Sequence, residues 1–511
     1  MLTFSLQHLA AAVAFTALPI WAQEAAKPAR PNIVYILADD LGYGDVQCNN
    51  PQGKIPTPNI DKLAAQGMRF TDAHSGSAVC TPTRYGILTG RYCWRSRLQS
   101  GVLGPYDKPL IAAGRLTVPA LLKQQGYATA CIGKWHLGWD WPMVKGTPDF
   151  TQPIAAGPTT RGFDHYFGTD VPNYPPYCFI ENDRTVGQPT ATLPKALLGN
   201  NLASKAGPAL PGWSLEGILP GLAEKACGYI EQQAKQNRPF FLYMPLTSPH
   251  TPIAPTREWQ GKSGLGAYAD FLMETDGVVG QVLAAIEKSG QAGNTLVIFT
   301  CDNGCAPYAG VKQMEQKGHY PSAGFRGYKA DIWDGGHRIP FIARWPGQIK
   351  PGTTSDQTIC LTSLMATCAE ITGAKLPDNA GEDSVSILPV LQGTAKGPVC
   401  EAVVHHSING SFSIRQGDWK LELCAGSGGW SEPKPKSQAA KGLPPAQLYN
   451  LAKDPGEKMN VQAENPEVVA RLTKLLEKYV ADGRSTPRRP ATERCQDQAA
   501  QGECWGNPGI D

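Results

Sequence analysis

Several charged and polar side chains of the sequence could act together on an anionic ester. Two adjacent pairs offer the oxygen ligands that a hard divalent cation prefers, namely Asp39 with Asp40 and Asp302 with Asn303. Positive charge and proton donors are supplied by Arg84, Lys134, His136, His250 and Lys329. Lys134 and His136 are two residues apart, so in an extended segment both side chains would face the same way. Fixed cations combined with a proton donor suit a compact oxyanion ester, either a sulfate or a phosphate.

Short apolar runs precede several of these side chains and are typical of buried parallel strands. Such runs occupy residues 32–38, 239–246 and 295–300, and each one is followed by polar residues. Ligands of open α/β sheets bind beyond the carboxyl ends of the strands. A single acidic pair would fit a turn or a helix cap equally well. Two pairs at strand ends of one sheet favour a metal site.

Helical patterns, for example over residues 59–66, 118–125 and 269–288, alternate with the apolar runs. This alternation predicts an α/β fold with a large, mixed, mostly parallel sheet sandwiched by helices. After residue 395, short alternating strands and an amphipathic helix over residues 466–480 predict a smaller C-terminal α+β subdomain with an antiparallel sheet. The predicted units are a signal peptide at 1–22, a catalytic domain at 28–395, the C-terminal subdomain at 396–483 and a polar tail at 484–511.

Composition narrows the class of protein. The net charge of +3 over 511 residues argues against a nucleic-acid partner, which would favour a strongly basic face. The apolar stretch at residues 9–21 is too short to span a bilayer and predicts export, to the periplasm or the exterior, with no membrane span. Fourteen cysteines fit an oxidising compartment. Cys495 with Cys504 is the favoured disulfide, and Cys301 with Cys305 is the second choice.

Cys80 lies in the stretch VCTPTRYGILTGR and has three ordinary interpretations: a disulfide partner, a small buried hydrophobe or a nucleophilic thiolate. A thiolate is a poor ligand for a hard cation. The stretch matches the pattern C-x-P-x-R-x-x-x-L-T-G-R, and the chain resembles the type I sulfatases. Further matching motifs over residues 31–458 are ADDLGYGD, GKWHLG, GFDHYFG, SPH, CDNG, GYKADIWDGG and LYNLAKDPGEK. The chain departs from many of these relatives at Ile332, Trp333 and Asp334.

The resemblance implies an alkaline phosphatase-like fold and a sulfuric ester hydrolase of the arylsulfatase-like kind. It also implies that a formylglycine-generating enzyme oxidises Cys80 to Cα-formylglycine (3-oxoalanine), whose hydrate carries two hydroxyls. Ca²⁺, with Mg²⁺ as the alternative, would be held by Asp39, Asp40, Cys80 in its modified form, Asp302 and Asn303.

The resemblance also implies a role for each cation. Lys134 and Lys329 would neutralise sulfate oxygens, and Arg84 would hold the hydrate. One hydroxyl would attack sulfur while His250 protonates the departing oxygen. His136 would then accept the proton of the second hydroxyl as sulfate leaves.

Two other functions remain alternatives at this point. The first is a phosphate or phosphonate monoester hydrolase of the same superfamily, and the second is an inactive exported homologue that binds glycans. A sulfated saccharide is the preferred substrate over a steroid or lipid sulfate, because no apolar membrane-facing segment exists. The residues predicted to bind this substrate at the rim of the cleft are Asn173, His405 and Arg415.

Overall fold

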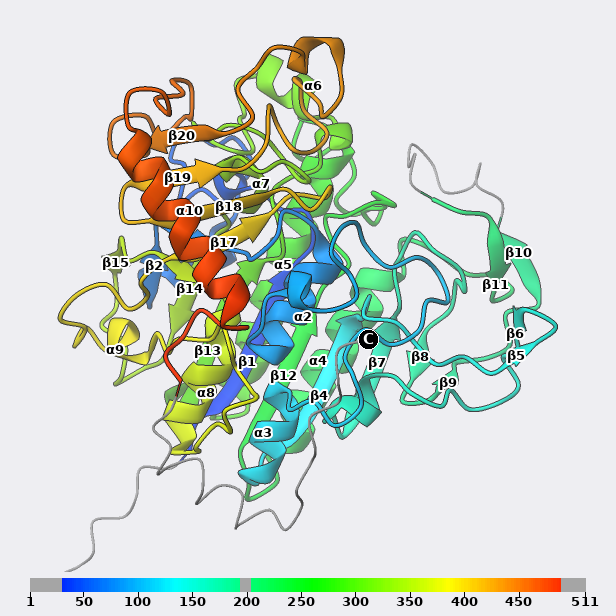
Figure 1. The fold of residues 1–511 in the computed structure, drawn as a ribbon. Helices are drawn as coiled ribbons and strands as arrows, with labels where there is room; N and C mark the ends of the chain where they lie inside the picture. The colour runs from blue at the N-terminus through cyan, green and yellow to red at the C-terminus, as the bar shows by residue number, and fades with distance from the viewer. Residues whose placement is uncertain (1–29, 194–203, 489–511) are drawn as a thin grey trace, which may run out of the picture.

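A mixed ten-stranded sheet forms the centre of the computed structural model, which describes residues 30–193 and 204–488 (Figure 1). Its strands run in the order β15 (Thr353–Ser355), β2 (Met68–Phe70), β14 (Phe341–Arg344), β13 (Thr295–Cys301), β1 (Asn32–Ala38), β12 (Phe240–Pro245), β4 (Ala128–Lys134), β7 (His165–Thr169), β8 (Ile180–Glu181) and β9 (Arg184–Thr185). The five central strands from β13 to β7 are parallel, whereas β14 and β8 are antiparallel to their inner neighbours. The predicted mixed, mostly parallel sheet is confirmed.

Strand β1 lies in the middle of this sheet and is buried along its whole length. Ile33 pairs with Phe241 of β12 on one side and with Leu296 of β13 on the other. A strand that is covered on both faces has no polar face, which explains why these strands read as continuous apolar runs. The three runs predicted as strands are therefore the three central strands β1, β12 and β13.

Helices cover both faces of the sheet (Figure 1). One group packs together and consists of α1 (Pro58–Ala65), α4 (Ile218–Gln233) and α5 (Ala267–Lys288). The other group also packs together and consists of α2 (Cys80–Thr89), α3 (Val118–Gln124) and α8 (Leu364–Thr372). The helices predicted at 59–66, 118–125 and 269–288 lie within two residues of α1, α3 and α5.

Two glycines allow β4 to lie close to its neighbours at the end where the site forms. Gly133 has a φ of +142°, and a Cβ atom there would come within 1.8 Å of the carbonyl oxygen of Pro245 in β12. A Cβ atom on Gly168 of β7 would come equally close to the carbonyl oxygen of Gly133. Only glycine fits these positions. The next residue after Gly133 is Lys134, which ends β4.

A smaller antiparallel sheet lies near the C-terminus, as predicted (Figure 1). Its strands are β17 (Val403–His406), β18 (Phe412–Gln416), β19 (Trp419–Glu422) and β20 (Gln447–Asn450). Helix α10 (Pro466–Ala481) packs on β18 and β19. Its apolar face, which includes Leu472, joins Leu421 of β19 in a separate small core. Burial of this face fixes the helix on the sheet.

Some sequence predictions concern residues that the structure does not describe. The signal peptide at 1–22 and the cysteine pair Cys495 and Cys504 lie outside the described residues. The predicted pairing of Cys301 with Cys305 is wrong, since both are unpaired thiols. Cys301 ends a buried strand, and its sulfur instead contacts the backbone of Leu41 and Asn303. None of the described helices is long and apolar enough to cross a membrane.

Candidate active site

The carboxyl ends of the central parallel strands bring the predicted site residues to one edge of the sheet. Asp39 and Asp40 follow β1, Lys134 ends β4, and Asp302 and Asn303 follow β13. Backbone hydrogen bonds tie these ends together. The amide of Asp39 donates to Ser248 beyond β12 at 3.0 Å, and the amide of Asp302 donates to Ala38 at 3.2 Å. Asp39, Asp40, Lys134, Asp302 and Asn303 are all completely or almost completely buried.

Two residues of the site have a left-handed backbone. Asp40 has a φ of +65° and His136 has a φ of +53°. Such conformations cost energy in residues other than glycine and persist where the surrounding structure holds them. The turn at His136 corrects the prediction that Lys134 and His136 lie in one extended segment with parallel side chains. The chain leaves the strand at Lys134 and bends.

Cys80 is the first residue of helix α2, directly after the extended residue Val79. Arg84 lies one turn later and is completely buried. Its Nε and Nη2 atoms donate to Oδ2 of Asp302 at 3.1 and 2.8 Å, and its Nη1 atom donates to the carbonyl of Lys134 at 3.0 Å. A guanidinium group whose three nitrogen atoms all donate hydrogen bonds is held in one orientation. The helix therefore starts at a point fixed against both β4 and β13.

The surroundings of Cys80 exclude two of its ordinary interpretations. Its sulfur is unpaired, so it is not in a disulfide. Burial raises the pKa of the thiol above its ordinary value, although Lys134 and Lys329 act in the opposite direction. A thiol with a raised pKa stays protonated at neutral pH and is a weak nucleophile. An unmodified Cys80 is therefore a buried, unreactive thiol among charged groups.

Two ion pairs neutralise the carboxylates that follow β1. The Nζ atom of Lys134 lies 2.7 Å from Oδ2 of Asp39, and the Nζ atom of Lys329 lies 2.8 Å from Oδ2 of Asp40. Burial alone would raise the pKa of Asp40, but Lys329 and then His250 outweigh it and lower that pKa. Burial would lower the pKa of Lys329, and Asp40 raises it well above its ordinary value instead. Both members of this pair are therefore charged.

The oxygen atoms at this edge fit a divalent cation. Oδ1 of Asp39 and Oδ1 of Asn303 are buried and have no hydrogen-bond partner among the described residues. A buried polar atom without a partner costs free energy, so each of these oxygens suits a ligand. Single ligand atoms of Asp39, Asp40 and His250 lie within 4.8 Å of one another. The predominance of oxygen donors fits a hard cation such as Ca²⁺ or Mg²⁺.

The hydrogen bonds of the two histidines define their tautomers. Nε2 of His136 lies 3.0 Å from the carbonyl oxygen of Leu103, which can only accept, so this nitrogen carries the hydrogen. Nδ1 is buried, has no hydrogen-bond partner within the described part of the chain and can take a proton. Burial, and then Lys134, lower the pKa of His136 to about 3. His136 is therefore neutral, with a bare Nδ1.

His250 has the opposite tautomer. Its Nδ1 atom faces the carbonyl oxygen of Thr251 and so carries the hydrogen, while Nε2 lies 3.8 Å from Oδ2 of Asp40. Burial, and then Lys134, lower the pKa of His250 well below its ordinary value. Nε2 is the atom that would hold a transferable proton.

Two residues that the sequence interpretation missed lie beside His136. Asp170 directly follows β7, and its Oδ1 atom accepts the backbone amide of His136 at 3.2 Å. The ring of Tyr174 lies 6.3 Å from the His136 ring, centroid to centroid. The strand-end rule that identified Asp39 and Asp302 could have identified Asp170 as well. The run HYFGT, which forms β7, is short and was not recognised as a strand.

The three residues predicted to bind substrate have different surroundings. Asn173 is buried next to Tyr174, and its Oδ1 atom has no hydrogen-bond partner among the described residues. His405 is completely buried, with Nδ1 2.9 Å from the carbonyl oxygen of Ser75. Arg415 pairs with Asp72 at 2.6 Å. The predicted place of His405 and Arg415 at an open rim is wrong, because both pack inside the junction between the two sheets.

This junction contains a second group of histidines, formed by His74, His337 and His405. Their ring nitrogens could converge on a metal, since single ligand atoms lie within 4.8 Å of one another. However, Arg415 lies 3.1 Å from Nε2 of His74, and Lys420 lies 3.1 Å from Nε2 of His337. The positive charges of Arg415 and Lys420, which contact the rings, would repel a metal ion at this position. The group is better described as part of a buried hydrogen-bond network.

Comparisons with known proteins agree with this geometry. The family profile described as Sulfatase matches residues 31–374. The chain is 33% identical over 487 residues to an N-acetylgalactosamine-6-O-sulfatase of Bacteroides thetaiotaomicron, covering 88% of this chain and 93% of that protein. It is 34% identical over 505 residues to arylsulfatase A of Homo sapiens, covering 94% and 93%. A solved structure from work on the metabolism of multiple glycosaminoglycans by Bacteroides thetaiotaomicron has a TM-score of 0.77 and 31% identity, covering 88% and 99%.

Proposed function

Because the chain belongs to the sulfatase family and is a sulfuric ester hydrolase, we propose that it removes sulfate from a sulfated saccharide by means of formylglycine formed from Cys80 and a bound Ca²⁺. The observation that carries this proposal is the surroundings of Cys80. It starts a buried helix whose Arg84 is fixed to Asp302, and the charges of Lys134 and Lys329 act on its sulfur. The N-terminus of a helix also favours negative charge.

A saccharide is the proposed substrate class for three reasons. One similar protein is named for an N-acetylgalactosamine sulfate, and one similar structure comes from work on glycosaminoglycans. Tyr174 also lies beside His136, where an aromatic ring could contact a sugar, and the amide oxygen of the preceding residue, Asn173, is buried without a hydrogen-bond partner among the described residues. The apolar leader predicted within residues 1–22 supports export to a compartment where such polymers occur.

The cation would be held by the oxygens of Asp39, Asp40, Asp302 and Asn303 and by residue 80. When bound, it supplies positive charge that stabilises oxyanions, and the hydrated aldehyde supplies two hydroxyls for attack on sulfur and for release. The chain's own side chains do the rest. Lys134 and Lys329 contact the sulfate oxygens, and Nε2 of His250 gives a proton to the departing sugar oxygen. Nδ1 of His136 accepts the proton of the remaining hydroxyl.

Mass spectrometry and a release assay test this proposal together. The protein is produced in an exporting host with an active formylglycine-generating enzyme, and the tryptic peptide that contains Cys80 is weighed. We expect the mass of the aldehyde or its hydrate, and release of inorganic sulfate from sulfated monosaccharides such as N-acetylgalactosamine 6-sulfate. An unmodified Cys80 peptide, in a host that converts a control sulfatase, would contradict the proposal.

Calcium is expected to raise the melting temperature of the protein, because it would satisfy the buried oxygens of Asp39 and Asn303, which have no partner among the residues that the structure describes. A ligand present at a hundred times its Kd stabilises the folded state by about 2.7 kcal/mol. The measurement is differential scanning fluorimetry with Ca²⁺ or with a chelator. Asp39→Asn should lose most of the shift, whereas Asp149→Asn, which makes the same change at a half-buried carboxylate that is not among the predicted ligands, should retain it. An equal shift in both variants would place the ion elsewhere.

A further inference from the structure

The segment that presents Lys329 contains a strained residue. Ala330 has a φ of +81°, which an L-residue other than glycine rarely adopts. Its amide donates to the carbonyl of Ala78 at 2.8 Å, and its carbonyl accepts the amide of Ile408 at 3.1 Å. Strain of this kind persists where neighbouring contacts enforce it. Ile408, which follows β17, belongs to the predicted C-terminal subdomain, so this unit helps to hold the strained position.

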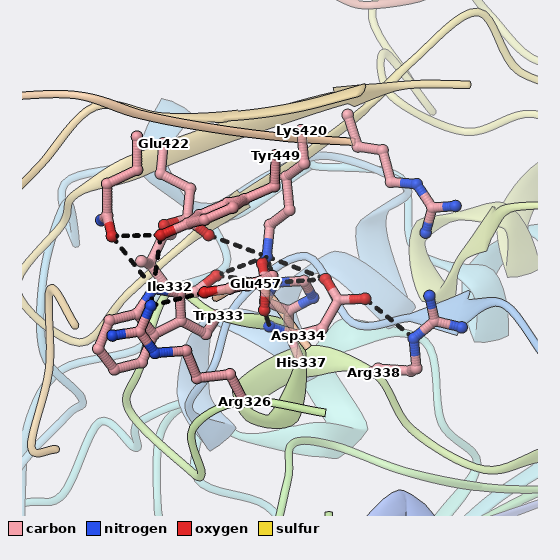
Figure 2. A network of polar contacts seen from close by, with 12 residues as sticks. Arg326, Ile332, Trp333, Asp334, His337, Arg338, Lys420, Glu422, Tyr449 and Glu457 are labelled. Atoms are coloured by element: carbon pink, nitrogen blue, oxygen red, sulfur yellow. Dashed lines mark hydrogen bonds and ion pairs between the residues drawn. The ribbon is translucent and has the colours of Figure 1, made fainter. Parts of the chain in front are cut away.

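Lys420 of β19 holds the same segment two residues further on (Figure 2). Its Nζ atom is completely buried and donates to the carbonyl of Ile332 at 3.0 Å, to Asp334 at 2.9 Å and to Glu457 at 2.7 Å. Oε1 of Glu422 lies 3.2 Å away. A single ammonium group thus joins the small sheet and the segment after β20 to the loop that presents Lys329.

Asp331 forms a second attachment between the same parts. Its Oδ1 atom accepts the amides of Trp430 and Ser431 at 2.8 and 3.0 Å, and its Oδ2 atom accepts the amide of Tyr328 at 3.0 Å. The amide of Ile332 also donates to the carbonyl of Ser427 at 2.7 Å. Residues 330–332, which directly follow Lys329, are therefore attached to residues 408–431, and Asp331 also ties Tyr328 into the loop.

We propose that Lys420 is a positioning residue for sulfate ester hydrolysis: by holding the carbonyl of Ile332 and the carboxylate of Asp334, it fixes the strained loop that places the Lys329 ammonium group in the active site. This inference rests on the proposed role of Lys329 at the sulfate group. It assigns the small C-terminal sheet a part in catalysis without contact with substrate. Misplacing a catalytic group by about 1 Å is enough to cost about a hundredfold in rate.

Burial explains why a lysine performs this task better than apolar packing would. Asp334, Glu422 and Glu457 are buried around one ammonium group, and each would lose a partner if it were removed. Buried charges require close, specific pairing, so the network tolerates one arrangement of the loop. An apolar contact of the same size would allow the loop to shift.

A double-mutant cycle tests the proposal with an aryl sulfate as substrate. Lys420→Met is expected to lower kcat/KM by about tenfold to a hundredfold in the otherwise unchanged enzyme. In a Lys329→Ala background the same change should have almost no effect, because the group that it positions is absent. Lys420→Arg, which keeps the charge, should restore part of the activity. All assays are run at a temperature where circular dichroism shows each variant to be folded.

A matched control separates positioning from general stability. Leu472→Ala in α10 opens a cavity in the small core and should lower the melting temperature of the protein. Leu472 does not belong to the Lys420 network, so kcat/KM of this variant should be unchanged. If Lys420→Met does not fold, Asp331→Asn, which keeps the shape of the side chain but loses one acceptor, is used in the same cycle.

The outcomes distinguish the two proposals. Full activity of Lys329→Ala would contradict the role of Lys329 itself, and with it the proposed function of that residue. A different result would overturn only the positioning role. In that case Lys329→Ala loses activity, and Lys420→Met lowers kcat/KM by the same factor whether Lys329 is present or replaced by alanine. A loss of activity in Leu472→Ala as large as that in Lys420→Met would also overturn it.

Discussion

Replacing Cys80 with serine is expected to stop steady turnover, with a loss in kcat of at least about 10³-fold. A serine presents one hydroxyl at the start of α2, whereas the hydrated aldehyde proposed for this position presents two. The serine hydroxyl can attack sulfur once and expel the sugar, but no second hydroxyl remains to release the sulfate. We expect one equivalent of desulfated product and a residue 80 peptide that carries sulfate, measured by rapid quench and mass spectrometry.

The control for this variant is Cys93→Ser, which makes the same change at another buried thiol. Cys93 lies near Ser96, away from the ion pairs of the site, so this variant should keep normal turnover. Continuous turnover by Cys80→Ser at a rate close to that of the unchanged enzyme would contradict release by a second hydroxyl.

Replacing His250 with asparagine is expected to affect sugar sulfates far more than activated aryl sulfates. The asparagine amide can still donate to the carbonyl of Thr251, but the proton of Nε2 is lost. General acid catalysis contributes about 10²–10⁴-fold where the leaving group needs a proton. A sugar oxygen needs one and a nitrophenolate does not. The measurement is kcat/KM for both substrates, and equal losses for the two would contradict the acid role.

The pH dependence of the same two rates gives a second check. Burial, and then Lys134, lower the pKa of His250, so only a small fraction of the His250 side chains is protonated at neutral pH. This protonated fraction increases as the pH falls. The ratio of the sugar sulfate rate to the nitrophenyl sulfate rate should therefore rise toward acidic pH. It should be flat in His250→Asn and unchanged in His165→Asn, which alters a half-buried histidine at the start of β7.

The sequence was sufficient for the strands and side chains whose signals are local. Strand β1 is buried on both faces, so its apolar run was unambiguous, and Asp39 and Asp40 follow directly. The C-terminal ends of parallel strands meet at one edge, which allowed Asp302 to be grouped with them. Strand β4 was not recognised as a strand, because ATACIGK mixes small and polar residues with few large apolar ones. The bend at His136 after it depends on tertiary contacts.

The junction between the two sheets could not be predicted for a different reason. His405 and Arg415 lie in short strands of the small sheet, and the sequence prediction placed both at the rim of the cleft. Their true neighbours, Ser75 and Asp72, lie more than three hundred residues earlier in the chain. An arginine in a buried ion pair and an exposed arginine that binds a ligand are the same letter in the sequence. Only the three-dimensional contacts distinguish them.

Three carboxylates of the site are paired with cations: Asp39, Asp40 and Asp302 are matched by the three fixed cations Arg84, Lys134 and Lys329. A divalent cation alone would leave two uncompensated positive charges in a buried volume, and the dianion sulfate alone would leave two negative ones. Together they keep the site neutral. Ion and product are therefore expected to bind with positive cooperativity, each raising the affinity of the other by the same factor. Inhibition by released sulfate should accordingly grow stronger as calcium rises.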